Sequence, residues 1–227
     1  MDNPLIELFF PRFCVGCGYV GTYLCHECER GMRRVTKTSC FYCGGPSSYG
    51  LTHPACKRQR GVDGHLSVYL YGGVFKKLLH ESKYKGAPLV LNTLLAFPQE
   101  ELFKHLYMWN SLFAPTVSSV PLHPQRERER GHNQATLIMD EYFIKHNFLA
   151  RPLLERIINT KHLASMENKQ KRRKHIQRAF RFIGETVPKT TILIDDVITS
   201  GSTIMECAKT LKGAGVQTVL AFSLAKG

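Results

Sequence analysis

One stretch decides the fold of this chain: Thr191-Ile192-Leu193-Ile194-Asp195-Asp196-Val197-Ile198-Thr199-Ser200-Gly201-Ser202-Thr203. Its apolar, β-branched run at 192–194 predicts a buried parallel strand. Asp195 and Asp196 stand where we expect this strand to end. Residues 199–203 form a loop of small hydroxylated side chains around one glycine, and a helix with one apolar face should follow.

This stretch has the composition of a binding site for a phosphorylated ribose. Backbone N–H groups of a glycine-centred turn, hydroxyl groups and the positive end of a helix all bind phosphate. Two carboxylates beside that turn suit a sugar diol or a hydrated Mg²⁺. The predicted binding residues are Asp195, Asp196, Thr199, Ser200, Gly201, Ser202 and Thr203. An ordinary strand–loop–helix joint with polar loop residues is the alternative interpretation.

The spacing of the stretch excludes two common phosphate motifs. It has no Gly-Lys-Ser/Thr, so it is not a P-loop, and its single glycine does not fit the dinucleotide fingerprint. It resembles the motif for phosphoribosyl pyrophosphate (PRPP) of type I phosphoribosyltransferases, which consists of four apolar residues, two acids and Thr-Ser-Gly-Ser-Thr.

The flanking sequence predicts an α/β domain with a parallel sheet, because predicted strands alternate with predicted helices. The predicted strands are 65–71, 116–120, 153–158, 192–195 and 217–222, and one helix is expected from Pro88 to about residue 106. Gly61–Gly64 reads as a joint. We therefore expect a small module at 1–62 and a larger domain at 63–227.

A second polar segment, residues 121–134, lies between a predicted strand and a predicted helix. Its two prolines are expected to exclude a helix at its start. Arg126 and Arg130 would supply positive charge to a pyrophosphate held by this loop. The alternative is a solvated Arg/Glu run with internal ion pairs.

Seven of the eight cysteines lie before residue 57, which indicates a metal-binding module in a reducing compartment. Two Cys-x2-Cys turns, Cys14/Cys17 and Cys25/Cys28, present four thiolates, the ligand set that structural Zn²⁺ prefers. So short a module needs zinc to supply its folding energy.

A second zinc site would use Cys40, Cys43 and Cys56, with His53 in place of a missing fourth cysteine. A degenerate site with His53 in solvent is the alternative. An interleaved pairing of the Cys-x2-Cys turns fits the same spacing.

The composition limits the remaining classes of function. The chain has 227 residues, an apolar share of 43% and a formal charge of +13, which suggests a polyanionic partner or solubility alone. No apolar run approaches the roughly 18 residues of a membrane span, and residues 1–13 lack the features of a secretory signal. Residues 159–181 carry eight Lys or Arg and one acid. The predicted nucleic-acid contacts there are Lys169, Lys171, Arg172, Arg173 and Lys174.

The order of motifs along nearly the whole chain resembles the ComF family. The motifs are Leu8–Cys14, the cysteine turns, Lys83–Gly86, Val120–Pro124, Arg130–Gln134 and Arg172-Arg173 before Ala179-Phe180. The sequence departs from the family's pattern at Gln59, His132 and His175. The resemblance implies a double zinc ribbon fused to a phosphoribosyltransferase-like domain. It also implies a bacterial cytoplasmic protein that handles incoming single-stranded DNA in natural transformation, beside a competence helicase.

Three functions fit these patterns. In the first, PRPP–Mg²⁺ reacts with a nitrogen nucleophile, and Asp195, Asp196 and Arg130 take the catalytic roles; such an enzyme would serve nucleotide or amine metabolism without DNA. In the second, the protein is a nucleic-acid-binding adaptor whose PRPP pocket is a sensor or a relic. In the third, the zinc ribbons are a scaffold for a partner protein. The intact pocket motif favours PRPP binding, and it does not decide whether transfer occurs.

Overall fold

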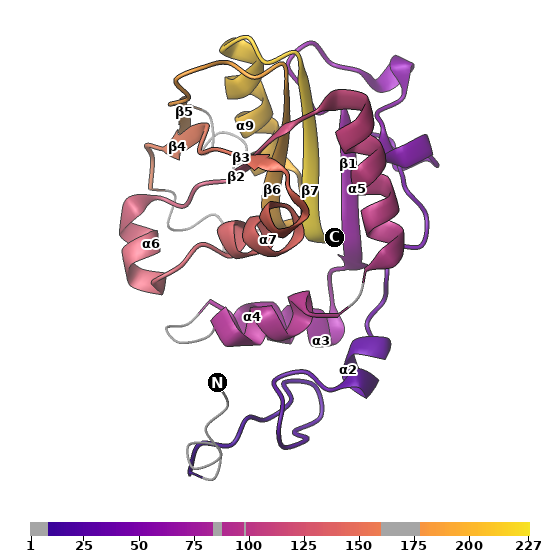
Figure 1. Cartoon of the computed structure of the whole chain (residues 1–227), viewed down its shortest axis with the longest axis vertical. Helices are drawn as coiled ribbons and strands as arrows, with labels where there is room; N and C mark the ends of the chain where they lie inside the picture. Colours follow the sequence, from indigo (N-terminus) through magenta and orange to yellow (C-terminus); the bar gives the residue numbers. More distant parts are fainter. Residues whose placement is uncertain (1–8, 84–87, 98, 160–177) are drawn as a thin grey trace.

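The protein is built around a five-stranded parallel sheet (Figure 1). The computed structural model describes residues 9–83, 88–97, 99–159 and 178–227. The strand order is β1-β7-β6-β2-β3, and every neighbouring pair is parallel. The strands are β1 (Gly64–Leu70), β2 (Thr116–Ser119), β3 (Leu149–Ala150), β6 (Thr190–Ile198) and β7 (Thr218–Lys226). The predicted α/β fold with a parallel sheet is confirmed.

The strands β6 and β7 form the centre of the sheet because both are almost continuous buried apolar runs. The sequence suggested that the strand ends at Asp195 and Asp196. In the structure both acids lie inside β6, which continues to Ile198. Asp195 is in register with Ser223, and the ladder continues until Ile198 pairs with Lys226. The two acids are therefore the sixth and seventh of the nine residues of this central strand.

Helices cover the two faces of the sheet unequally (Figure 1). The helices α3 (Gly73–Glu81), α4 (Pro88–Leu95), α5 (Glu100–Phe113) and α7 (Gln134–Tyr142) pack around one core cluster. The second cluster contains α9 (Ser202–Gly213) and the antiparallel pair β4 (Leu154–Arg156) and β5 (Phe180–Phe182). A 3-10 turn, η3 (Ile144–His146), follows α7.

Two predicted elements differ from the observed ones. The helix expected from Pro88 to about residue 106 is two helices, α4 and α5, which end and begin at Leu95 and Glu100. The segment after β2 was expected to be a loop, but it forms α6 (Pro124–Arg130). Proline is favoured at the first position of a helix, where its missing N–H costs nothing, and the ring of His123 caps the N–H of Gln125.

The cysteine-rich segment lies against the edge strand β1. Its regular elements are α2 (His26–Arg30), η1 (Ser48–Gly50) and η2 (Pro54–Cys56). The backbone N–H of Val35 donates to Val68, and the N–H of Leu70 donates to Arg33, so residues 33–35 extend the sheet edge. The indole N–H of Trp109 on α5 donates to the carbonyl of Tyr49 at 2.9 Å. A domain boundary at 62/63 stays a prediction.

Candidate functional site

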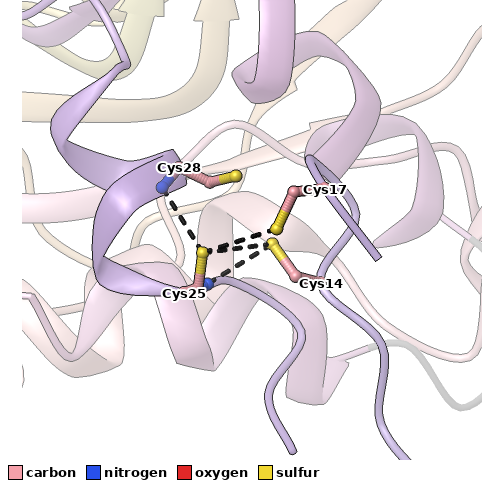
Figure 2. A group of neighbouring side chains, drawn as sticks. All are labelled: Cys14, Cys17, Cys25 and Cys28. Atoms are coloured by element: carbon pink, nitrogen blue, oxygen red, sulfur yellow. Dashed lines mark hydrogen bonds between the residues drawn. The ribbon is translucent and has the colours of Figure 1, made fainter. Parts of the chain in front are cut away.

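The first cysteine cluster brings together the sulfur atoms of Cys14, Cys17, Cys25 and Cys28 (Figure 2). The sulfur of Cys25 lies 3.7 Å from that of Cys14 and 3.7 Å from that of Cys17. Tetrahedral zinc with Zn–S bonds of about 2.3 Å holds its sulfur ligands about 3.8 Å apart, so this spacing fits the metal. All four cysteines are free thiols.

Local structure explains why the two turns of this cluster meet. The thiol of Cys25 caps α2 by accepting the N–H of Cys28. A Cβ on Gly16 would lie 2.5 Å from the sulfur of Cys28, so only glycine lets the turns approach this closely.

The second cluster consists of Cys40, Cys43, His53 and Cys56, whose ligand atoms lie within 4.8 Å of one another. The Nδ1 atom of His53 is 3.4 Å from the sulfur of Cys43, and its Nε2 lies 2.8 Å from the carbonyl of Pro46. If Nε2 carries the proton and donates it to that carbonyl, Nδ1 keeps its lone pair for a metal. The structure therefore groups the turns in sequence order without interleaving and brings His53 into the cluster.

The two clusters support structural zinc. Each offers a complete set of four nitrogen or sulfur ligands, which leaves no open coordination position for a reacting molecule. The assignment of the individual ligands stays a prediction.

A separate cavity of ≈ 410 Å³ lies at the carboxyl end of the sheet. Ligands of parallel α/β sheets bind at this end. The residues that line it and carry the argument below are Arg126, Arg130, Arg156, Asp195, Asp196, Thr199 and Thr203. Elements far apart in the sequence thus bring two acids, three arginines and two hydroxyl groups to one hollow.

The two acids line this cavity from β6. The carboxylate of Asp195 accepts the backbone N–H of Asp196 at 2.9 Å, and that of Asp196 accepts the N–H of Val197 at 2.7 Å. Burial, and then the charge of Asp196, raise the pKa of Asp195 well above its usual range. A bound cation, or hydroxyl groups that donate to the carboxylate, would relieve this penalty.

The arginines line the cavity from two elements. Arg126 and Arg130 stand one turn apart on α6, and Arg130 donates to Gln134 at 3.3 Å. Arg156 comes from β4, and its guanidinium lies 5.5 Å from the ring centre of Phe180. Burial lowers the pKa of Arg130 and of Arg156, yet both guanidinium groups stay charged at neutral pH. Three cations in one cavity suit a polyphosphate.

Sequence reasoning missed Arg156. Its segment was read as a strand, and a strand pattern alone did not show which face an isolated arginine would take. In the structure Arg156 is the cross-strand partner of the buried Phe180, and its side chain lines the cavity.

The predicted phosphate loop is divided between two cavities. Thr203 lines the cavity with the acids, Ser200 and Gly201 line a neighbouring cavity of ≈ 290 Å³, and Thr199 lines both. Gly201 has φ +69° and immediately precedes α9, a conformation that favours glycine. The hydroxyl of Ser202, the first residue of α9, lies 2.9 Å from that of Ser200.

A larger cavity, ≈ 640 Å³, lies between residues 34–39, β1 and α5. Three of its charged groups already have partners within the protein: Arg34 is paired with Glu29, Glu101 is paired with Lys104, and Lys226 donates to the hydroxyl of Ser39. We therefore place the candidate ligand site at the acids and arginines. The predicted nucleic-acid contacts Lys169, Lys171, Arg172, Arg173 and Lys174 lie outside the described residues.

The fold and the cysteine clusters define a class: α/β proteins with a mainly parallel sheet and an N-terminal zinc-binding module. The family described as "Double zinc ribbon domain" matches residues 5–57. We call the parts around the two clusters the first ribbon (residues 9–35) and the second ribbon (residues 36–62).

Known proteins resemble this chain over most of its length, beyond the double zinc ribbon. "Competence protein ComFC" of Streptococcus pneumoniae is 28% identical over 89% of this chain and 87% of its own length. "Competence protein ComFC" of Bacillus subtilis is 28% identical over 88% and 83%. "DNA utilization protein YhgH" of Escherichia coli K12 is 27% identical over 95% and 94%. These matches, with the double zinc ribbon, support the ComF family as the family that this chain resembles over most of its length.

The names of these relatives refer to competence and to DNA utilisation. Across the part of the chain that the structure covers, we find no helix with the length and apolar character needed to cross a bilayer.

Proposed function

We propose that the α/β domain binds PRPP with Mg²⁺, and that the protein handles single-stranded DNA. The observation that carries the first part is the ≈ 410 Å³ cavity, because it joins an acid pair, hydroxyl groups before a helix and three arginines. PRPP presents a diol, a 5′-phosphate and a pyrophosphate, and each has a matching set of groups here.

Each part of the cavity has a proposed role. The loop 199–203 and the start of α9 bind the 5′-phosphate, as helix N-termini with free amides do. Asp195 and Asp196 bind the ribose hydroxyl groups and Mg²⁺, which prefers carboxylate oxygen. Arg126, Arg130 and Arg156 neutralise the pyrophosphate, which is the role that catalysis of transfer would need. A nitrogen nucleophile acting on bound PRPP would make the protein an active phosphoribosyltransferase, the alternative to a binding function.

Calorimetry with PRPP–Mg²⁺ tests this proposal. Asp195→Asn combined with Asp196→Asn should abolish detectable binding and leave the thermal unfolding curve cooperative. The matched control is Asp140→Asn combined with Glu141→Gln, which removes two neighbouring acids from α7 outside the cavity. A folded cavity variant that keeps the wild-type affinity would overturn the proposal.

The DNA part rests on the names of the relatives and on charge. The chain carries +13, and residues 159–181 hold eight of its 31 Lys and Arg. Basic residues bind nucleic-acid backbones by releasing counterions, with little dependence on sequence. We propose Lys169, Lys171, Arg172, Arg173 and Lys174 as phosphate contacts, and a helicase acting on incoming DNA as the partner.

A further inference from the structure

The second ribbon touches the loop that we propose to bind phosphate. Phe41 stands between Cys40 and Cys43, and its ring lies over Gly201: a Cβ built on Gly201 would be 2.8 Å from the Cζ atom of Phe41. The ring is held edge-on by Tyr42 at 5.2 Å and by His65 at 5.7 Å. Edge-to-face contacts of this kind are a favoured arrangement of aromatic rings and stabilise the position of Phe41.

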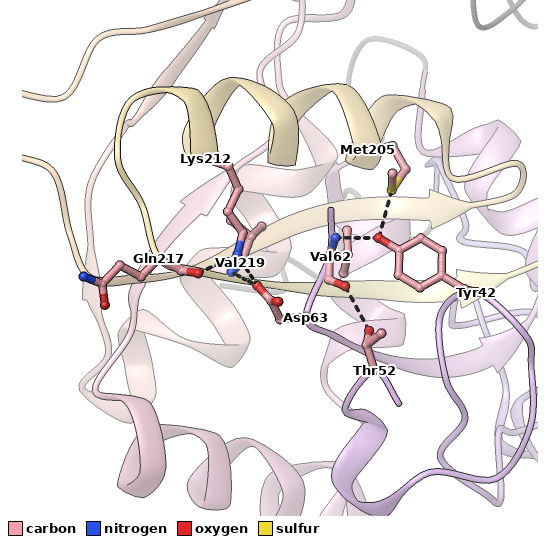
Figure 3. Close-up of polar contacts among 8 residues, drawn as sticks. All are labelled: Tyr42, Thr52, Val62, Asp63, Met205, Lys212, Gln217 and Val219. Carbon is pink, nitrogen blue, oxygen red and sulfur yellow. Dashed lines mark hydrogen bonds and ion pairs between the residues drawn. The ribbon is translucent and has the colours of Figure 1, made fainter. Parts of the chain in front are cut away.

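The next residue, Tyr42, reaches the helix that follows the loop (Figure 3). Its hydroxyl accepts the backbone N–H of Val62 at 2.8 Å and lies 3.6 Å from the sulfur of Met205, near the start of α9. Arg58 stacks on the outer face of this ring, with its guanidinium 4.6 Å from the ring centre. Two consecutive residues of one cysteine turn therefore touch the joint between β6 and α9.

The residue that follows the second ribbon, Asp63, contacts the far end of α9. Lys212 lies 2.7 Å from the carboxylate of Asp63, and both side chains are largely buried. The hydroxyl of Thr52 donates to the carbonyl of Val62 at 2.9 Å (Figure 3). Tyr42 of the ribbon thus contacts α9 near its first turn, and Asp63, the residue that follows the ribbon, contacts its last turn.

We propose that the second ribbon holds the phosphate loop in its binding conformation, with Phe41 as the positioning residue. This inference rests on the proposed function for the identity of the ligand, but the contact itself does not. The zinc ligands on either side of Phe41 fix the turn, and the ring then fixes Gly201 in its left-handed conformation. A loop that is already ordered loses less entropy when it binds phosphate.

Hydrogen exchange in the ligand-free protein tests the contact without any ligand. In Phe41→Ala, the amides of residues 199–205 should exchange about tenfold faster, because the ordered loop becomes a smaller fraction of the ensemble. Phe41→Leu keeps an apolar side chain against Gly201 and should restore most of the protection. Phe13→Ala is the control, since Phe13 also flanks a zinc-site cysteine, lies in the first ribbon and is 53% exposed.

Binding of ribose 5-phosphate then connects the contact to function. This probe has the phosphate and the diol but no pyrophosphate, so it reports on the loop and the acids. Phe41→Ala should weaken it about tenfold with zinc content unchanged, and Phe13→Ala should leave it unchanged. Equal exchange in wild type and Phe41→Ala, or equal losses in Phe41→Ala and Phe13→Ala, would overturn the positioning role. If Phe41→Ala exchanges faster but the wild type binds no ribose 5-phosphate, the positioning role stands, and the proposed binding of the phosphate and the diol by the loop and the acids is refuted.

Discussion

The surroundings of Asp195 disfavour the ionised form of its side chain. Asp195 lies partly buried on a central strand, where it lines the cavity, and Asp196 adds a second negative charge beside it. Groups with strongly shifted pKa values and a specific charged neighbour concentrate at functional sites. A ligand that binds the ionised carboxylate, above all a cation, therefore lowers the free energy needed to ionise Asp195.

Replacing this carboxyl by an amide should stabilise the empty protein. A raised pKa in the folded state means that folding loses stability as the pH rises through that pKa, since the ionised form is disfavoured. Asp195→Asn should gain about 1 kcal/mol of unfolding free energy at pH 8. The gain should shrink as the pH falls toward the ordinary carboxyl range. Denaturant titrations at pH 8 and pH 5 measure this, with Glu185→Gln, an exposed acid, as the control. A variant that is equally destabilised at both pH values would contradict the argument.

His53 is the second residue whose role can be isolated. With both clusters filled, elemental analysis should give close to two zinc ions per chain. His53→Ala should lower this to about one, because three cysteines hold the ion less tightly than four ligands. His26→Ala is the control: His26 lies between Cys25 and Cys28 and belongs to neither cluster. Two zinc ions in His53→Ala would rule out the histidine as a ligand.

At the scale of elements, a buried network joins α2 of the first ribbon to β1. Glu29 is only 3% exposed; it accepts the hydroxyl of Tyr69 at 2.9 Å and pairs with Arg34. The amide of Gln99 donates to the same hydroxyl at 3.0 Å. This network ties the zinc module to the sheet by largely buried polar contacts.

Removing the central carboxylate should loosen that joint. Glu29→Ala leaves the buried hydroxyl of Tyr69 without an acceptor, which should cost about 2 kcal/mol of unfolding free energy. Arg34 is half-exposed, so water compensates its charge and no larger cost is expected. Glu27→Ala, two residues away on the exposed face of α2, removes only a surface pair with Arg30 and should change stability by less than about 0.5 kcal/mol. Equal effects of the two substitutions in denaturant titrations would show that the network is not structural.

The elements also show what sequence patterns can predict. The apolar face of α9, with Ile204, Cys207, Ala208 and Leu211, was expected and is buried, because a helical period over a dozen residues is a strong signal. The strands β3 and β5 have two and three residues and were missed, since so few residues show no period. The acids and Thr199 and Thr203 of the candidate site could be found from one contiguous motif. Arg156 and Phe41 could not, because long-range packing alone brings them to the loop and the cavity.

At the scale of the whole molecule, the positive charge is unevenly distributed. The formal charge of the chain is +13, and residues 159–181 alone hold eight basic residues against one acid. Such a segment attracts a polyanion whatever its conformation. The expected polyanion is single-stranded DNA, in line with the DNA-utilisation relatives.

Changing Lys171, Arg172, Arg173 and Lys174 together to Ala should reduce the salt dependence of DNA binding. Each phosphate contact contributes about 0.7 to the slope of log K against log salt for single strands, so the slope should flatten by about two to three units. All sequences should be weakened alike. Fluorescence anisotropy over a salt series measures this.

The control variant removes the same charge from elsewhere, at the exposed Lys104, Lys145, Lys189 and Lys209. Its slope should stay at the wild-type value. A wild-type slope in the first variant, or the same flattening in both, would place the DNA contact elsewhere, with Arg33, Arg34, Lys57 and Arg58 of the ribbons as the next candidates.

The position of β7 has a consequence for the order of folding during synthesis. Asp63 and Val219 bond each other across the β1–β7 seam although they are 156 residues apart in the chain. The ribbons leave the ribosome first and can fold around zinc, but β1 must then wait about 8 to 30 s for its partner strand at ordinary rates of translation. During that time its inner edge is an unpaired template for other chains. Chaperone demand should therefore peak between completion of β1 and emergence of β7, and zinc supply alone should not relieve it.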